Sequence, residues 1–214
     1  MALITAVSFY EDTTDEIFSH FYNLEDKRLI GNKSGKIDSE YNDDIRYDVS
    51  ILKGSIMVPD TFNVYGEGIP YTDEMCLSQG MDPANTRQAL SILDNQIMII
   101  LADEQYKDIT FKIYIRVKEK EYGDITLAQL DQENFDFMAD GVTQSFGVDE
   151  YEMVEGNGLK FFAFENDLTE NECRYATIID GHMVYVFAQT GDKKLTDNQR
   201  KILEKIALSI KSDL

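Results

Sequence analysis

The sequence predicts an α+β protein in which helices pack against an antiparallel β-sheet. The first observation is residues 171–214, where a strand, a two-residue turn, a second strand and a helix follow one another. The second is an alternation of apolar and polar side chains along residues 108–117. The third is the order of the elements, because strands joined by short turns alternate with helices instead of repeating a βαβ unit. This order favours antiparallel neighbours in the sheet.

Residues 1–45 are predicted to stand apart from the main domain. Ile17, Phe18, Phe21 and Tyr22 repeat at helical spacing within residues 12–24, and such a helix either docks on the main body or binds a partner. Residues 31–44 are polar and are the best candidate for a linker. We therefore expect an N-terminal helix and linker over residues 1–45, and one α+β domain over residues 46–214.

The first part of the main domain is predicted to hold short strands, a loop and a helix. The short strands are expected over residues 48–52, 54–58 and 61–65. Residues 66–80 have no periodicity and are expected to form a long irregular loop. Asp82 is an N-cap candidate followed by Pro83 at the first helical position, which starts a helix to about residue 93.

Two longer strands and a long helix are expected next. Residues 96–102 are a continuous apolar run, which is typical of a strand buried on both faces. Along residues 108–117 the apolar side chains are expected to face the core, namely Ile109, Phe111, Ile113, Ile115 and Val117. The alternate side chains, which include Lys112, Tyr114 and Arg116, would face the other way. Residues 126–146 are expected to form one helix that starts at a capping box of Thr126 and Gln129.

The last part of the chain is predicted to form two hairpins and a closing helix. The first hairpin pairs residues 151–155 with 159–164, and the second pairs residues 173–179 with 183–188 around Asp180-Gly181, a typical type I′ turn. Thr196 and Gln199 form a second capping box, which starts a helix through residue 210. This helix must bury its apolar stripe, and the preceding hairpin is the nearest surface. The stripe consists of Ile202, Leu203, Ile206, Ala207 and Ile210.

Composition restricts the classes of function. The chain has a formal net charge of −20 and no basic cluster along its sequence, which argues against binding to nucleic acids or anionic membranes. No stretch approaches the apolar length of a transmembrane helix. Residues 1–7 are apolar, and they are either an ordinary strand or arm, or the stub of a signal or anchor. The second interpretation favours an extracytoplasmic setting at the cell envelope, and the first a cytoplasmic one.

No catalytic, metal-binding or cofactor-binding motif is recognisable in the sequence, and no cofactor is expected. Cys76 and Cys173 are too few for a disulfide framework and lack zinc-site spacing, and whether they pair is left open. His20 and His182 have no nucleophile or metal-ligand spacing around them. The acidic runs at residues 103–108 and 165–172 lack the spacing of a calcium loop and are expected to be solvated. A hydrolase that uses two carboxylates is the enzymatic alternative.

The segment over residues 65–81 is the candidate partner-binding site. Tyr65, Ile69, Tyr71 and Met75 lie on it without helical or strand periodicity, and aromatic and methionine side chains are common interface anchors. The alternative is that these side chains cover the open edge of the sheet.

Several segments resemble the PsbP-like superfamily. The strand and proline turn of residues 54–62, the long helix and the glycine hairpin follow its pattern, and the C-terminal part from Arg174 to Lys211 matches it best. One departure is Phe62, where relatives often carry a tryptophan, a residue that this chain lacks. The resemblance covers about residues 47–214. It implies an α/β/α sandwich that binds or scaffolds a protein partner without catalysis, often at the bacterial envelope, with a cytoplasmic chaperone or adaptor as the alternative setting.

Overall fold

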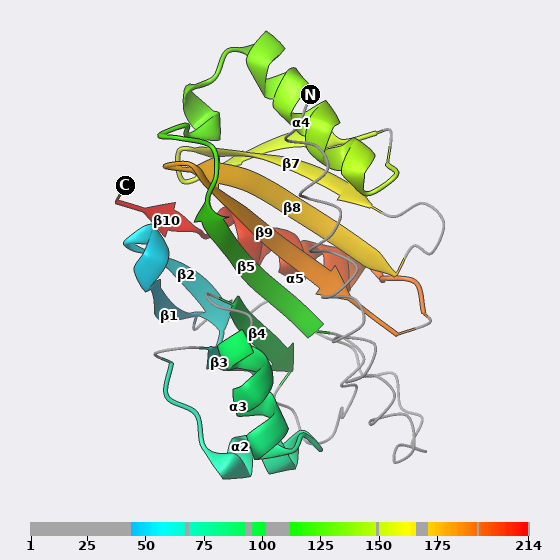
Figure 1. The fold of residues 1–214 in the computed structure, drawn as a ribbon. Helices are drawn as coiled ribbons and strands as arrows, with labels where there is room; N and C mark the ends of the chain where they lie inside the picture. The colour runs from blue at the N-terminus through cyan, green and yellow to red at the C-terminus, as the bar shows by residue number, and fades with distance from the viewer. Residues whose placement is uncertain are drawn as a thin grey trace.

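The larger of two sheets is antiparallel, and its seven strands lie in the order β3-β4-β5-β9-β8-β7-β6 (Figure 1). In chain order the strands are β3 Phe62–Gly66, β4 Gln96–Leu101, β5 Lys112–Lys120, β6 Glu152–Gly156, β7 Leu159–Glu165, β8 Glu172–Ile179 and β9 His182–Gln189. The inner strands β5 and β9 pair from Lys112 opposite Gln189 to Lys120 opposite His182. The predicted α+β class with an antiparallel sheet is confirmed.

The smaller sheet has three strands, which join the start of the domain to its end. They are β1 Asp44–Val49, β2 Gly54–Pro59 and β10 Lys211–Ser212, and a 3-10 turn at Ser50–Leu52 connects β1 to β2. The computed structural model describes residues 44–66, 69–92, 96–101, 112–148, 150–165, 171–191 and 193–213. The predicted helix at residues 12–24 and most of the linker lie outside these ranges. The strand expected over residues 48–52 is wrong in part, because β1 ends at Val49 and Ser50–Leu52 form the turn before Lys53, which has a φ of 43°.

One face of the larger sheet packs on α5, which spans Asp197–Leu208, and on the small sheet. Alternate side chains of β5 and β9 point to this face, and those of Ile113, Ile115 and Val186 are fully buried. The predicted apolar stripe of α5 is buried against them, and its closest strand is β9. This packing confirms the prediction that the C-terminal helix buries its apolar stripe against the preceding hairpin.

The opposite face carries helices at its two ends (Figure 1). The helix α4 Gln132–Ser145 packs on the β6–β8 end, while α2 Asp73–Ser78 and α3 Pro83–Ile92 lie at the end formed by β3 and β4. Helices on both sides of the sheet make the predicted α/β/α layering. The inner strands β5 and β9 lie between the two helical groups, and none of the helices in the described residues is drawn over them on this side.

The predicted turns and the last capping box are confirmed. Asp180 and Gly181 have φ angles of 46° and 78°, and Asn157 and Gly158 have 51° and 80°, as type I′ turns require. At the start of α5, the amide of Gln199 donates to the Thr196 hydroxyl at 3.3 Å, and the Gln199 side chain accepts from the Thr196 amide at 2.8 Å. Local sequence therefore determines these three features.

The single helix predicted over residues 126–146 is wrong. Leu127–Gln129 form a 3-10 turn, and α4 begins only after Asp131, whose carboxylate accepts from the Asn134 amide at 2.9 Å. The hydroxyl of Thr126 accepts instead from the amide of Asp180, at 3.1 Å, and caps no helix. A contact to a distant turn thus replaces the expected local cap.

The irregular loop predicted over residues 66–80 is also wrong in part, because it contains α2. This helix has six residues and is capped by Thr72, whose hydroxyl accepts from the Met75 amide at 3.2 Å. A helix of fewer than two turns cannot reveal a 3.6-residue repeat in the sequence.

Candidate functional site

The structure places the four predicted partner-binding residues at different depths. Tyr65 is fully buried, and its hydroxyl donates to the carbonyl oxygen of Met75 at 3.2 Å. Ile69 is buried at 9% exposure, whereas Tyr71 and Met75 are partly exposed. The rings of Tyr65 and Tyr71 meet edge to face with centroids 5.4 Å apart. These contacts attach α2 to β3, and Tyr65 and Ile69 offer little side-chain surface to a partner.

We call the described part of residues 65–81 the α2 corner. Leu77 is a large apolar side chain of this corner that is exposed, at 63%. Its helix is held at the N-terminal end, by the Thr72 cap and by an ion pair between Asp73, the first residue of α2, and Arg87 on α3 at 2.5 Å. The neighbouring Cys76 is fully buried, so Leu77 points outward from a fixed turn of helix. The sequence does not reveal this exposure, because a segment without periodicity gives no side chain a predicted face.

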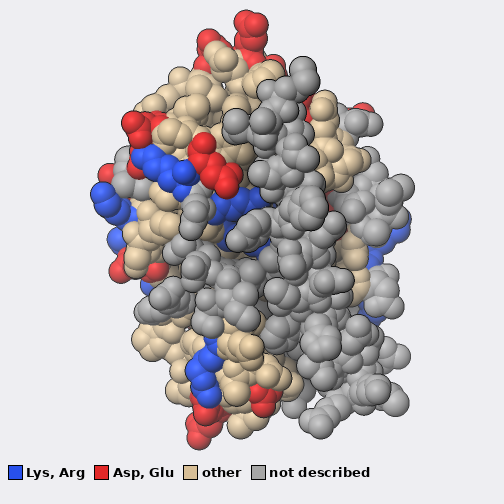
Figure 2. Space-filling view, in the orientation of Figure 1, with Lys and Arg blue, Asp and Glu red and all other residues tan. Residues whose placement is uncertain are grey.

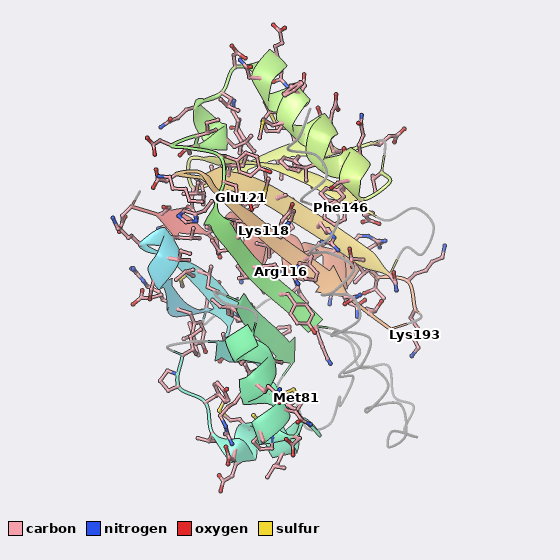
Figure 3. The ribbon with its side chains drawn as sticks, viewed as in Figure 1. Met81, Arg116, Lys118, Glu121, Phe146 and Lys193 are labelled. Atoms are coloured by element: carbon pink, nitrogen blue, oxygen red, sulfur yellow. The ribbon has the colours of Figure 1, made fainter. Side chains whose placement is uncertain are left out.

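A second cluster lies on the inner strands between α4 and α3, and we call it the central face. It combines three cations with three aromatic rings: Arg116 and Lys118 on β5, Arg174 on β8, Tyr185 and Phe187 on β9, and Phe146 at the end of α4. Cross-strand register puts them on one side of the sheet, since Arg116 is opposite Tyr185 and Arg174 is opposite Phe187. Figure 3 shows Arg116 and Lys118 along β5 on this side.

Arg174 is sandwiched between two rings of the central face. Its guanidinium carbon lies 4.2 Å from the centre of the Phe146 ring and 4.8 Å from that of Phe187. Its Nε donates to the carboxylate of Glu172, two residues earlier on the same strand. The side chains of Arg174 and Glu172 are 15% and 16% exposed, so both charges are largely withdrawn from water. A planar guanidinium suits this position, because it stacks on rings while its edge donates to a carboxylate.

The other two cations extend the same arrangement along β5. The guanidinium carbon of Arg116 lies 5.8 Å from the centre of the Phe187 ring, and the ammonium of Lys118 lies 5.2 Å from that of Tyr185. Phe187 also stacks on Tyr114, with centroids 5.1 Å apart. Each cation is within the range at which a ring attracts a positive charge.

The central face is locally basic in a strongly acidic protein. The whole chain has a net charge of −20. Figure 2 shows Lys and Arg atoms in the middle of this side of the molecule, with Asp and Glu atoms beside them and at its two ends. The sequence does not reveal this gathering because Arg174 lies on β8, far along the chain from Arg116 and Lys118 on β5, and folding brings the three onto one face. In the sequence, the alternation of Lys112, Tyr114 and Arg116 predicts that these side chains share one face of β5. It does not indicate which side chains of β8 and β9 lie on that face.

The alternation predicts that Lys112, Tyr114 and Arg116 face away from the core, but the first part of this second face of β5 is also buried. Lys112 and Tyr114 are each only 4% exposed. The aromatic side chains of β9 share this face and add apolar area to it, which the sequence of β5 alone cannot reveal.

The described members of the acidic run at residues 165–172 are bound to arginines. Glu165 accepts from Arg200 through both carboxylate oxygens, at 2.6 and 2.9 Å, and Glu172 accepts from Arg174. No three His, Cys, Asp or Glu side chains converge as a metal site would within the ranges given above. The run at residues 103–108 lies outside them.

The two cysteines are free thiols on opposite faces of the larger sheet. Cys173 packs with the α5 side and Cys76 with the α2 side, so they do not pair. Burial raises the pKa of Cys173 to about 12, with the neighbouring Glu165 carboxylate acting in the same direction. Burial also raises the pKa of Cys76. Both thiols are therefore held in the protonated form at neutral pH.

Comparison with solved structures finds chains of similar fold. No family model and no curated protein sequence matches the chain. The fold is similar to the solution structure of cyanobacterial PsbP (CyanoP) from Synechocystis sp. PCC 6803, with a TM-score of 0.42 and 14% sequence identity. The match covers 85% of this chain and 98% of that one.

Among the described residues, no helix has both the length and the apolar composition needed to cross a bilayer.

Proposed function

We propose that this chain is a non-enzymatic protein-binding domain whose central face takes an acidic segment of the partner. The observation that carries the proposal is the gathering of Arg116, Lys118 and Arg174 over aromatic rings in a protein of net charge −20. Cations held over rings give a surface both positive charge and apolar area, the combination that Arg and aromatic side chains supply at protein interfaces.

The chemistry of this face defines the kind of partner it fits. Carboxylates would meet the guanidinium of Arg116 and the ammonium of Lys118, and apolar side chains would meet the partly exposed ring of Phe146. A partner segment with acidic residues next to aromatic or aliphatic ones matches both requirements. A nucleic acid also offers negative charge and flat bases, but its dense phosphates would be repelled by the rest of this acidic surface.

A charge-reversal experiment tests the proposal. A fluorescent peptide with alternating acidic and aromatic residues is titrated with the wild-type chain and with Arg116→Glu/Lys118→Glu, and anisotropy is followed at low and moderate salt. The matched control is Arg46→Glu/Lys201→Glu, which changes net charge equally at exposed positions on β1 and α5.

We expect the central-face variant to weaken binding at least about tenfold, the control about twofold or less, and added salt to weaken binding of the wild type. Equal weakening by both variants would mean that net charge alone acts, and would overturn the proposal. Tighter binding of single-stranded RNA than of the peptide would replace it with nucleic-acid binding. A circular dichroism spectrum of each variant establishes that it is folded.

The proposal also includes the location of the protein in the cell and the absence of catalytic activity. Attachment to the bacterial envelope is what the family resemblance implies, and fractionation of cells that express the natural gene tests it against the cytoplasmic alternative. The rival function is a carboxylate-based hydrolase. Turnover of any ester, amide or glycoside substrate that is lost on changing a single Asp or Glu would establish that rival.

A further inference from the structure

Aromatic rings on the inner strands are withdrawn from water although helices in the described residues cover only the two ends of this side of the sheet. Tyr114, Tyr185 and Phe187 are each 4% exposed, and Lys112 beside them is also 4% exposed. Figure 1 shows β5 and β9 between α4 and α3. Neighbouring side chains account for part of this burial, since Phe146 and Arg174 lie over Tyr185 and Phe187. Aromatic rings that are only a few per cent exposed are typical of a surface that other residues cover.

The chain contains a segment whose chemistry complements this face. Residues 11–26 have no lysine or arginine, and their acidic residues are Glu11, Asp12, Asp15, Glu16, Glu25 and Asp26. Between these acids lie Ile17, Phe18, Phe21 and Tyr22, whose spacing fits one side of a helix. Carboxylates thus flank a group of apolar side chains, and a basic, aromatic surface would bind both kinds.

The connection to β1 is long enough to permit this contact within one molecule. Residues 27–43 separate the segment from β1, which begins at Asp44. Fully extended, these residues span roughly 55 Å at about 3.3 Å per residue. A domain of this size has a radius of gyration of about 15 Å, so any side of it is within reach.

We propose that residues 11–26 of this chain bind its own central face, with their acidic side chains toward Arg116, Lys118 and Arg174. The apolar side chains of the segment cover the ring edges of Tyr185 and Phe146. The inference deepens the proposed function and rests on it in one respect: the segment competes with the partner for the face, so a partner binds only by displacing it. Because the segment is tethered, its effective concentration is about millimolar, and only a partner of higher affinity succeeds.

Two measurements on the full chain test the inference. The first is zero-length carbodiimide coupling, which joins a lysine amine to a carboxylate in contact with it, followed by mass spectrometry of the monomer. We expect Lys118 to couple to a carboxylate within residues 11–26. Lys201, which is exposed on the opposite side in α5, is the internal control, and Lys118→Arg keeps the charge but removes the reactive amine.

The second measurement is binding of the acidic fluorescent peptide to a chain whose segment is neutralised, Asp12→Asn/Asp15→Asn/Glu16→Gln. The control neutralises acids that lie closer to β1, Asp38→Asn/Glu40→Gln/Asp43→Asn, with the same change in net charge. We expect the segment variant to bind the peptide at least about fivefold more tightly than the control, because the competitor is weakened.

The outcomes separate the inference from the proposed function. Coupling of Lys118 no stronger than that of Lys201, or coupling found only in dimers, would overturn the inference. Equal tightening of peptide binding by the two neutralised chains would also overturn it while leaving the proposed function intact. Coupling of Lys118 within the monomer, together with no peptide binding by any variant, would support the contact and reject the proposed function.

Discussion

The guanidinium carbon of Arg174 lies 4.2 Å from the centre of the Phe146 ring, which joins the end of α4 to the middle of the sheet. Phe146 also meets Phe164 and Tyr185, with centroids 5.4 and 5.9 Å apart. One side chain at the last turn of a helix thus contacts three strands, β7, β8 and β9. The central face depends on this contact, because Phe146 fixes one side of the Arg174 sandwich.

Replacing Arg174 should cost more stability than replacing an exposed arginine. Arg174→Ala removes two ring contacts and leaves Glu172 largely buried without its donor, so we expect a loss of about 2–3 kcal/mol in the free energy of unfolding. Arg174→Lys should lose about half as much, because an ammonium cannot stack flat between two rings. Urea unfolding measures both. Arg46→Ala is the control, since its ion pair with Asp48 is 65% and 79% exposed and is worth about 0.5 kcal/mol or less. Equal losses for Arg174→Ala and Arg46→Ala would contradict the sandwich.

Stability should fall at alkaline pH because buried thiol and phenol groups stay protonated in the fold. Burial raises the pKa of Cys173 from 9.0 to about 12, so below pH 9.0 its contribution is fully present. Above that pH the thiol ionises in the unfolded chain first, and the free energy of unfolding should decrease by about 1.4 kcal/mol per pH unit until the folded-state pKa is reached. Burial likewise raises the pKa of Tyr151 to about 12, which adds to the loss above pH 10.0.

The Cys173 part of this effect can be isolated. Urea unfolding of the wild type and of Cys173→Ala is compared from neutral pH to about pH 11. We expect the variant to be less stable at neutral pH but to have a shallower decline above pH 9.0, because it has no thiol to ionise. Parallel declines would show that Cys173 titrates alike in the folded and unfolded chains.

The two type I′ turns allow a matched test of close packing. Gly158 and Gly181 have φ angles of 80° and 78°, so alanine is strained equally at both. A Cβ at Gly158 meets nothing within 4 Å, whereas one at Gly181 would lie 1.9 Å from the carbonyl oxygen of Gly123. Gly158→Ala should therefore cost about 1–2 kcal/mol from the backbone alone, and Gly181→Ala at least about 1 kcal/mol more. Thermal and urea unfolding measure the difference, and equal costs would argue against the packing of the Gly123 turn on this hairpin.

The features that the sequence predicts correctly are those determined within a few residues. The Asp180-Gly181 turn and the Thr196 capping box form because their own φ preferences and side chains suffice. Thr126 has the same capping pattern as Thr196, yet its hydroxyl accepts from Asp180, which is distant in sequence. Tertiary structure therefore decided between two equally good local patterns.

The sequence predicts only part of the central face, for the same reason. The alternation along β5 predicts that Tyr114 and Arg116 share a face, and they do. The rings that meet these side chains come from β9 and from the end of α4, and no spacing in the sequence relates Phe146 to Phe187. The same holds for Tyr65, whose burial depends on α2, a helix too short to leave a periodic signal.

The α2 corner remains a predicted partner contact, and its buried and exposed residues should respond differently. Tyr65→Ala should lose about 3–5 kcal/mol of stability, because it empties a fully buried site and removes the hydrogen bond to Met75. Leu77→Ser should change stability by about 0.5 kcal/mol or less, since Leu77 is 63% exposed.

If the corner contacts a partner, Leu77→Ser should nevertheless reduce partner recovery in a pull-down with the intact chain as bait. The control is Glu74→Ser, an exposed change on the same helix. Recovery that is equal for the wild type, Leu77→Ser and Glu74→Ser would count against the corner. Because Arg116→Glu/Lys118→Glu leaves α2 unaltered, recovery that is lost only in that variant would locate the contact at the central face instead.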